Sequence, residues 1–318
     1  MRKQLKEKSA RTGYIRNSSY IILSMFVLLS ACSSRQTETD SREITEQLGP
    51  NEHLQTIADH LLQARRNQQF TRALALRYPN LDRESAYRIQ LMTLESQEKA
   101  GESLAGWKMG GTRITEAGAS PDPLFGYSLE SQVYQSGERV SLGDLTTNEP
   151  MVEAEITVWI GEDLPGPGIT REELLRAIDG ISGGVEIISS RQRPASEDQP
   201  ETETTAHLVA DGISHGGAIF GDTRMAPDDI DFDTEEAWIS IETEEKARGS
   251  ASAIMGQTGN PIDAVLWLAN ALPKHGRHLR AGDFVLTGSL YENPTMEAGV
   301  NAAVSFTNLG SIQVRLIE

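Results

Sequence analysis

The sequence predicts an α+β protein in which a helical portion, residues 53–100, precedes a β-rich portion, residues 101–318. Two observations predict this class. Apolar residues recur at helical spacing over 53–68 and again over 82–97, whereas beyond Gly101 glycines multiply and short β-branched and aliphatic runs take over. The chain of 318 residues is also long enough to bury one sizeable core.

Each of the two N-terminal helices is predicted from one apolar face. The residues expected to point inward are Leu54, Ile57, Leu61 and Leu62 in the first helix and Ala86, Ile89, Leu91 and Leu94 in the second. A helix with one apolar face is stable only when that face is covered. Both helices are therefore expected to pack against the rest of the domain.

Short β-rich runs predict the strands of the second portion. They span residues 151–160, 184–189, 217–220, 236–242, 283–287, 302–306 and 311–317. Two helices are expected between them. The first spans 170–179, where Thr170 and Glu173 form a capping box, and the second spans 261–272, which Asn260 caps.

The first 31 residues have the features of an export signal. A basic stretch precedes a short apolar core, Tyr20 to Leu29, whose ten residues fall well short of the roughly 20 that span a bilayer. The run Leu29-Ser30-Ala31-Cys32 then matches a bacterial lipobox, and Cys32 is the only cysteine in the chain. We expect Cys32 to be lipidated and residues 32–52 to form a flexible tether.

This signal predicts an exported, lipid-anchored protein that faces the periplasm or the cell exterior. The alternative is an uncut membrane anchor with an incidental cysteine, which the composition, the order of the segments and the place of Cys32 disfavour. Ser33 gives no reason for retention in the inner membrane, so the outer membrane is favoured. With no second cysteine, the domain has no internal disulfide and relies on its core.

Net charge excludes one class of partner. The whole chain carries −17, and residues 1–31 contain six Lys or Arg and one Glu, so the remainder carries −22. A surface of that sign repels nucleic acid, and we expect no nucleic-acid binding.

Two glutamates one residue apart, Glu153 and Glu155, are the best indication of function. On the strand predicted over 151–160 side chains alternate between faces, so both carboxylates point the same way, opposite an apolar face. Two like charges side by side cost free energy unless something neutralises them, and a divalent cation would do so. The alternative is an exposed strand face on which each glutamate pairs with Lys or Arg.

A third carboxylate, Glu186, interrupts the apolar run Val185-Glu186-Ile187-Ile188. A charge in such a strand is rarely tolerated unless it is paired or bound to a metal. Three carboxylates without a His or Cys cluster favour a hard cation, in the order Mg²⁺, Mn²⁺ and Ca²⁺, and disfavour zinc.

From about residue 53 to residue 318, the chain resembles a known family. The ordered blocks resemble the 2-oxopent-4-enoate hydratases and their 2-oxo-3-hexenedioate decarboxylase relatives in the fumarylacetoacetate hydrolase superfamily. The blocks are Gly106-Trp107-Lys108-Met109-Gly110, Val152-Glu153-Ala154-Glu155-Ile156, Val185-Glu186-Ile187 with Ser190-Arg191, Val209-Ala210-Asp211, Gly259-Asn260-Pro261 with Trp267-Leu268-Ala269-Asn270, and Ala281-Gly282-Asp283-Phe284-Val285-Leu286-Thr287-Gly288-Ser289. The resemblance implies a mixed β-roll with an N-terminal helical portion.

The resemblance also implies roles for single residues. Glu153, Glu155 and Glu186 match metal ligands, Lys108 matches a lysine near the substrate, and Thr287, Ser289 and Arg191 are assigned to substrate binding. Asp211 is assigned as a second catalytic group, although it is equally well explained as a turn residue. His215 is taken as a loop histidine and receives no role.

The predicted function is that of a metal-dependent lyase, a hydratase or decarboxylase of aromatic catabolism that acts on a small-molecule 2-oxo acid. The resemblance implies that Mg²⁺, or Mn²⁺, chelates the 1-carboxylate and 2-oxo group and stabilises the enolate formed on deprotonation. The alternatives are a hydrolase that cleaves a C–C bond in an acylpyruvate, and a non-catalytic lipoprotein that binds a 2-oxo acid. We also expect a homo-oligomer.

Departures from the family pattern motivate the last alternative. Ser189 stands where the family usually has aspartate, Glu130-Ser131 replace an Asp-Asp pair, and Gly212 replaces an asparagine. All three predicted metal ligands and Lys108 are present, which favours an enzyme.

Overall fold

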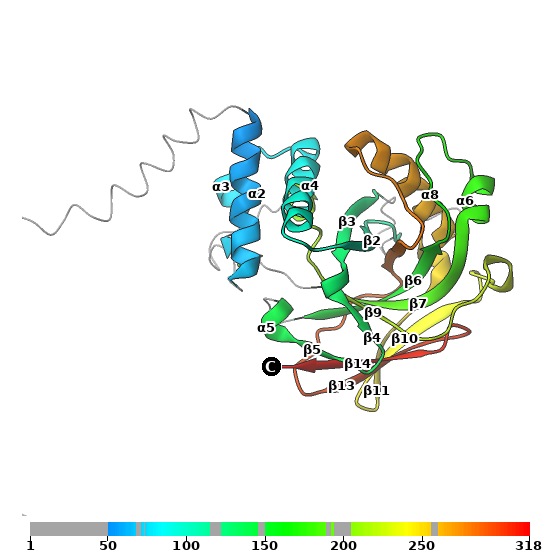
Figure 1. Cartoon of the computed structure of the whole chain (residues 1–318). Helices are drawn as coiled ribbons and strands as arrows, with labels where there is room; N and C mark the ends of the chain where they lie inside the picture. The colour runs from blue at the N-terminus through cyan, green and yellow to red at the C-terminus, as the bar shows by residue number, and fades with distance from the viewer. Residues whose placement is uncertain are drawn as a thin grey trace, which may run out of the picture. The chain divides into compact units, whose positions relative to one another are not determined.

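Three helices occupy the first part of the chain that the structure, a computed structural model, describes. These are α2 (Pro50–Arg66), α3 (Leu74–Arg77) and α4 (Arg83–Lys99). Asp82 caps α4 by accepting a hydrogen bond from the Ser85 N–H at 2.8 Å, as an N-terminal aspartate should. The eight residues predicted to point inward from α2 and α4 are all buried, and the two helices pack side by side (Figure 1).

The described residues are 50–67, 71–72, 74–114, 122–145, 150–188, 192–193, 205–255 and 260–318. All of them belong to a unit that spans Gly49–Glu318. The expected signal segment, Cys32, Ser189 and Arg191 lie outside the described residues.

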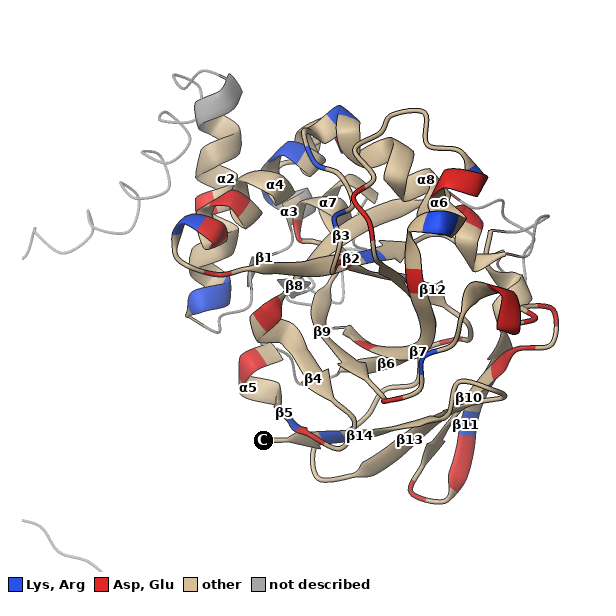
Figure 2. Ribbon diagram, turned by 45° about the vertical axis from the view of Figure 1, so that its right-hand side comes forward, with Lys and Arg blue, Asp and Glu red and all other residues tan. Residues whose placement is uncertain are grey.

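A curved seven-stranded sheet forms the centre of this unit, in the order β3-β2-β12-β6-β7-β9-β4 (Figure 2). Its strands are β2 (Leu104–Gly110), β3 (Leu124–Leu129), β4 (Val133–Gln135), β6 (Met151–Ile160), β7 (Ile178–Ile188), β9 (His215–Phe220) and β12 (Phe284–Ser289). The pairs β2–β12 and β4–β9 are parallel and the remaining pairs antiparallel. The sheet is therefore mixed.

A five-stranded sheet packs below it, in the order β11-β10-β13-β14-β5. Its strands are β5 (Arg139–Ser141), β10 (Glu236–Ile241), β11 (Glu244–Ser250), β13 (Asn301–Phe306) and β14 (Ser311–Ile317). A two-stranded sheet joins β1 (Thr71–Arg72) to β8 (Gln192–Arg193). The predicted α+β class with an N-terminal helical portion is confirmed.

Four further α-helices lie in the described residues. They are α5 (Leu142–Leu145), α6 (Arg171–Ala177), α7 (Thr205–Ala210) and α8 (Pro261–Ala271). The predicted capping box of Thr170 and Glu173 is present, and the Asn260 side chain accepts from the Ile262 N–H at 3.0 Å. Helix α6 is shorter than predicted because Ile178 is already extended and begins strand β7.

Strand β7 begins earlier than predicted, because glycines interrupt the β-rich sequence pattern in its first half. These glycines serve close packing. A Cβ on Gly183 would lie 2.5 Å from the Phe306 ring, and one on Gly184 would lie 2.1 Å from Thr157 Oγ1. Glycine is the residue that permits such approach. The first half of β7 therefore lacks the continuous run of β-branched residues from which a strand is predicted.

The strand β6 separates the core from the concave face of the sheet. Its apolar face, formed by Val152, Ala154, Ile156, Val158 and Ile160, is buried as predicted. On the concave side lie, in order, Glu153, Glu155, Thr157 and Trp159. Next to Trp159 a small apolar cluster of Ala218, Phe220, Phe284 and Leu286 fills the interior. The carboxylates thus lie on a strand whose opposite face is buried in the core.

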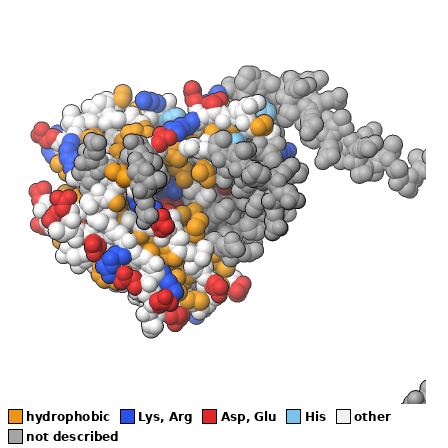
Figure 3. All heavy atoms as spheres, turned by 180° about the vertical axis from the view of Figure 1, so that it is seen from behind, with side chains coloured by type: hydrophobic (Ala, Val, Ile, Leu, Met, Phe, Trp, Pro, Cys, Tyr) orange, Lys and Arg blue, Asp and Glu red, His pale blue; other side chains and the backbone are white. Residues whose placement is uncertain are grey.

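On the face seen in Figure 3, acidic and basic side chains are interspersed with hydrophobic ones. Among the described residues, no helix combines the length and the apolar character needed to cross a membrane.

Candidate metal centre

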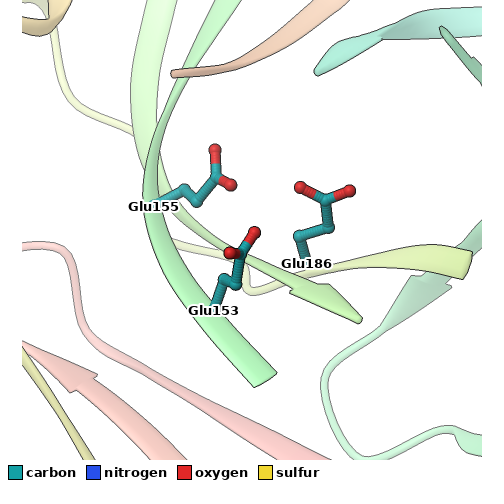
Figure 4. A group of neighbouring side chains, drawn as sticks. All are labelled: Glu153, Glu155 and Glu186. Carbon is teal, nitrogen blue, oxygen red and sulfur yellow. The ribbon is translucent and has the colours of Figure 1, made fainter. Parts of the chain in front are cut away.

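The three predicted carboxylates meet on the concave face of the large sheet. Strands β6 and β7 pair antiparallel, which sets Glu153 directly opposite Glu186 and Glu155 opposite Gly184. One ligand oxygen from each of the three lies within 4.8 Å of the others, and all three side chains point toward a common centre (Figure 4). Glu155 and Glu186 are fully buried and Glu153 is 8% exposed. The alternative of an exposed strand face with surface ion pairs is therefore wrong.

Each carboxylate is oriented by a hydrogen bond from its own donor. Glu186 Oε1 lies 2.8 Å from His215 Nδ1 and 3.3 Å from Lys108 Nζ. Glu155 Oε2 accepts from the backbone N–H of Gly288 at 2.6 Å, and Glu153 Oε1 accepts from Asn293 Nδ2. Such supporting contacts fix the direction in which a ligand presents its remaining oxygen.

Within the three carboxylates, two buried oxygens have no hydrogen-bond partner among the described residues, namely Glu155 Oε1 and Glu186 Oε2. An unsatisfied buried carboxylate oxygen is costly, so such atoms call for an explanation. A hard divalent cation would take both as ligands, since Mg²⁺ and Mn²⁺ prefer carboxylate oxygens. The donor set therefore fits the predicted metal.

In the absence of a metal, the three carboxyl groups differ in pKa. Burial raises the pKa of Glu153 to about 8, and the Glu186 carboxylate adds to this rise. Burial and the same carboxylate raise the pKa of Glu155 well above its usual range. Burial acts in the same direction on Glu186, but Lys108 and His215 outweigh it and hold the pKa of Glu186 below its usual range. The metal-free cluster thus favours an ionised Glu186 and the protonated forms of Glu153 and Glu155.

These protons predict a pH-dependent metal affinity. Between the ordinary value of 4.5 and about 8, the folded metal-free chain holds a proton on Glu153 that the unfolded chain releases. This group's contribution to the stability of the metal-free fold therefore falls as pH rises through that window. A cation must displace the proton, so its affinity should rise by about tenfold per pH unit for each proton displaced.

Calorimetric titration with Mg²⁺ at pH 6, 7 and 8 measures this effect directly. Mg²⁺ should also raise the melting temperature more at pH 8 than at pH 6. Equal dissociation constants at the three pH values would contradict a proton held on Glu153 in the metal-free fold.

Lys108 lies on β2, next to the carboxylates, and only 3% of its side chain is exposed. Its Nζ donates to the carbonyl oxygen of Ile213 at 3.1 Å and pairs with Glu186. Burial alone would lower the pKa of Lys108, but Glu186, Glu153 and Glu155 outweigh it and the pKa is raised. Lys108 is therefore a buried lysine and not a surface one, and its amine is charged beside the cluster.

Three residues at this site were not assigned from the sequence. His215 was taken as a loop histidine, but it begins β9 and bridges Glu186 to Ser128, whose Oγ lies 2.9 Å from His215 Nε2. Because an ionised carboxylate can only accept, the His215 ring donates from Nδ1 to Glu186. Asn293 lies in the loop after β12, where no periodic pattern could have placed it.

The predicted hydroxyls of the β12 end have partners within the protein. Thr287 Oγ1 donates to the Ile156 carbonyl at 2.9 Å, and Ser289 Oγ lies 2.7 Å from Asn293 Oδ1. Ser289 thereby supports the Asn293 amide that contacts Glu153. Their roles in substrate binding stay predictions, as does that of Arg191, which is outside the described residues.

Asp211 lies in the turn between α7 and β9 and does not join the three-glutamate cluster. Its carboxylate is paired with Arg65 of α2, with Oδ1 at 2.9 Å from Nη2. Its catalytic role stays a prediction, and its observed contact is structural.

Gly288 supplies both a turn and a donor at the site. Its φ is +113°, and a Cβ there would lie 1.9 Å from Thr112 Oγ1. We expect Gly288→Ala to destabilise the fold by more than about 1 kcal/mol and to weaken Mn²⁺ binding, because the N–H to Glu155 moves. Gly276→Ala is the matched control, since its φ is +71° and nothing lies within 4 Å of the added Cβ. Equal Mn²⁺ affinity in both variants would contradict the role of Gly288.

A known family model matches most of this chain. Residues 97–317 match the family model described as fumarylacetoacetate (FAA) hydrolase C-terminal. The chain belongs to the fumarylacetoacetate hydrolase family. This membership confirms the fold that the resemblance implied, the mixed β-roll with its N-terminal helices.

Within the fumarylacetoacetate hydrolase family the chain is similar to hydratases and a decarboxylase. The 2-hydroxyhexa-2,4-dienoate hydratase of Comamonas testosteroni is 29% identical over 273 residues, which cover 85% of this chain and 100% of that relative. The 2-keto-4-pentenoate hydratase 2 of Dechloromonas aromatica is 31% identical over 233 residues, or 73% of this chain and 85% of that one.

A solved structure of a fumarylacetoacetate hydrolase family member provides a further comparison. The 4-oxalocrotonate decarboxylase from Pseudomonas putida G7, complexed with magnesium and adipate, superposes with a TM-score of 0.74 and is 27% identical. The match covers 84% of this chain and 98% of that one. The same decarboxylase is also known complexed with calcium and acetate. Both metals are among those predicted for this chain.

Two departures from the family pattern can be placed in the described structure. Gly212 adopts a left-handed φ of +70° in the turn after α7. Ser131 lines a cavity of about 370 Å³ that His215 also borders. Neither departure removes a group from the carboxylate cluster or from Lys108.

Proposed function

We propose that this protein is a divalent-metal-dependent lyase, a hydratase or decarboxylase, that acts on a small 2-oxo acid of the 2-oxopent-4-enoate kind. One observation carries the proposal. Three buried glutamates present two unpartnered oxygens at a common centre, and the charged amine of Lys108 lies beside them. The hydratase and decarboxylase relatives, one of them with bound magnesium, support this reading.

The chemistry divides between the metal ligands and the lysine. Glu153, Glu155 and Glu186 would hold the cation, which, when bound, supplies charge stabilisation for an oxyanion on the substrate. Lys108, which pairs with Glu186, is able to hold or move a proton at its Nζ. The buried setting keeps bulk water away from this amine, so that a charge on it acts over a low dielectric.

The experiment that tests the function is a substrate panel with Mg²⁺ or Mn²⁺ and the purified full-length chain. Loss of dienol absorbance without release of CO₂ identifies a hydratase, and release of CO₂ identifies a decarboxylase. Cleavage of an acylpyruvate into two acids would instead favour the hydrolase. A failure to turn over any 2-oxo acid with either metal would contradict the lyase and favour a binding protein.

We also propose that the protein is exported and anchored through a lipid on Cys32, as its signal motif predicts, with the domain outside the cytoplasmic membrane. Cys32→Ser should abolish lipidation and leave an unprocessed precursor. Mass spectrometry of the mature N-terminus and membrane fractionation measure both effects. Unmodified wild-type protein in the cytosolic fraction would contradict the anchor. We expect the domain to form a homo-oligomer, which light scattering of the purified protein measures.

A further inference from the structure

The turn that joins α7 to β9 has an unusual backbone. Gly212, Ile213 and Ser214 all have left-handed φ angles, of 70°, 53° and 56°. A β-branched residue such as Ile213 rarely adopts this conformation, which costs of the order of 1–3 kcal/mol where it persists. Strain of this kind is kept only when the surroundings hold it in place.

The strained turn supplies contacts to the candidate active site. The Ile213 carbonyl accepts from Lys108 Nζ at 3.1 Å, and the His215 N–H donates to the Gly212 carbonyl at 3.2 Å where β9 begins. Gly126 of strand β3 lies against both this turn and the Lys108 side chain. A Cβ on Gly126 would lie 2.7 Å from Gly212 O and 3.1 Å from Lys108 Cδ.

Arg65 of the N-terminal helix α2 holds this turn through hydrogen bonds. Arg65 Nη2 donates to the Asp211 backbone carbonyl at 2.8 Å and to Asp211 Oδ1 at 2.9 Å. Arg65 Nη1 donates to the Tyr127 hydroxyl at 3.1 Å, and this hydroxyl donates to Gln97 Oε1 at 2.6 Å. The guanidinium therefore connects α2, β3 and α4 to the first residue of the turn.

We propose that Arg65 is a positioning residue, which acts through the Asp211–Ser214 turn to hold Lys108 in place; this inference rests on the proposed function. Without its two bonds to Asp211, the strained turn can relax and withdraw the Ile213 carbonyl from the amine. Helix α2 then contributes to the active site without touching the substrate. The two Nη groups of Arg65 matter here, because one donates to Asp211 and the other to Tyr127, whereas lysine offers one point charge in their place.

The test compares Arg65→Met and Arg65→Lys with Arg277→Met in the full-length chain. Arg277 is the control: its two Nη groups each donate to one oxygen of Glu98 at 2.8 Å, and these bonds do not involve the turn. The first readout is the rate at which Lys108 is acetylated, followed by mass spectrometry. Arg65→Met should raise that rate by at least about tenfold relative to wild type, because a buried amine becomes exposed by local opening. Arg277→Met should leave it unchanged, and Arg65→Lys should be intermediate.

The second readout is a double-mutant cycle with Lys108→Met. Arg65→Met should lower kcat by about tenfold, the usual size of an outer-shell effect, and should change KM little. In the Lys108→Met background it should have no further effect, because the residue through which it acts is gone. Oxalate titrations in the presence of Mg²⁺ repeat the cycle without turnover.

The outcomes separate this inference from the proposed function. Equal acetylation of Lys108 in wild type and Arg65→Met, or independent effects in the cycle, would overturn the positioning role. A wild type without turnover would count against the lyase only, and acetylation together with the oxalate cycle would still decide the role of Arg65. Should Arg65→Met fail to fold, Arg65→Lys gives the same comparison, since it retains the charge.

Discussion

Replacing Glu186 by glutamine is expected to weaken Mn²⁺ binding by at least about tenfold and to destabilise the metal-free fold by about 2 kcal/mol. The second effect arises because Glu186 is the ionised member of the cluster. Its Oε1 is the acceptor for both His215 and Lys108, and lysine is costly to bury without its counter-charge. Calorimetric titration with Mn²⁺ and thermal denaturation in EDTA measure the two effects separately.

Glu153→Gln and Glu155→Gln provide the controls. Burial raises the pKa of Glu153 to about 8 and raises that of Glu155 well above its usual range, so the metal-free fold favours the protonated form of each. A neutral amide should therefore leave that fold nearly as stable as wild type, while the loss of a ligand still weakens Mn²⁺ binding. A Glu186→Gln variant as stable as the other two would contradict the assigned charges. Unchanged Mn²⁺ affinity in all three would contradict the metal site.

Lys108→Met is expected to lower kcat by at least about a hundredfold, the lower end of what a positioned proton donor or acceptor contributes. KM should rise much less, because the charge acts mainly where negative charge develops on the substrate. Mg²⁺ affinity should stay the same or increase, since a positive charge beside the carboxylates has been removed. Steady-state kinetics and metal titration on the same preparation check these expectations.

Lys246→Met is the matched control, because Lys246 is a surface lysine that pairs with Glu244 and its side chain is 37% exposed. It should leave kcat and KM unchanged. If Lys108→Met also retained wild-type turnover, the proton-transfer group would have to be sought at Asp211 or Glu130. If neither wild type nor variant turned over any substrate, and Lys108→Met weakened oxalate binding by one charge contact, the protein would be a binder.

Sequence patterns predicted the elements whose periodicity was uninterrupted. Strand β6 has the predicted bounds, Met151–Ile160, because its apolar and carboxylate faces alternate without a break. Strand β7 was shortened in the prediction because glycines replace β-formers where Phe306 and Thr157 approach closely. Strand β11, Glu244–Ser250, was missed because an exposed edge strand carries charged residues rather than a β-rich pattern.

The metal ligands could be predicted because each interrupts an apolar strand, where a charge needs an explanation. The supporting residues could not. Asn293 and Arg65 reach their partners across 140 and 146 residues of sequence, and such pairing depends on how loops and helices pack. His215 was set aside because a lone histidine before two glycines resembles a loop residue. Only the pairing of β7 with β9 brings it to Glu186.

We propose that turnover depends on a divalent cation held by the three glutamates. The most direct measurement determines Mn²⁺ occupancy and turnover of a 2-oxo acid on the same EDTA-treated sample as Mn²⁺ is added. We predict no turnover at zero occupancy, a rate that rises in proportion to occupancy, and saturation at a single Mn²⁺ per chain. Turnover in the presence of EDTA, or Mn²⁺ binding that survives replacement of Glu153, Glu155 and Glu186 together by glutamine, would contradict it.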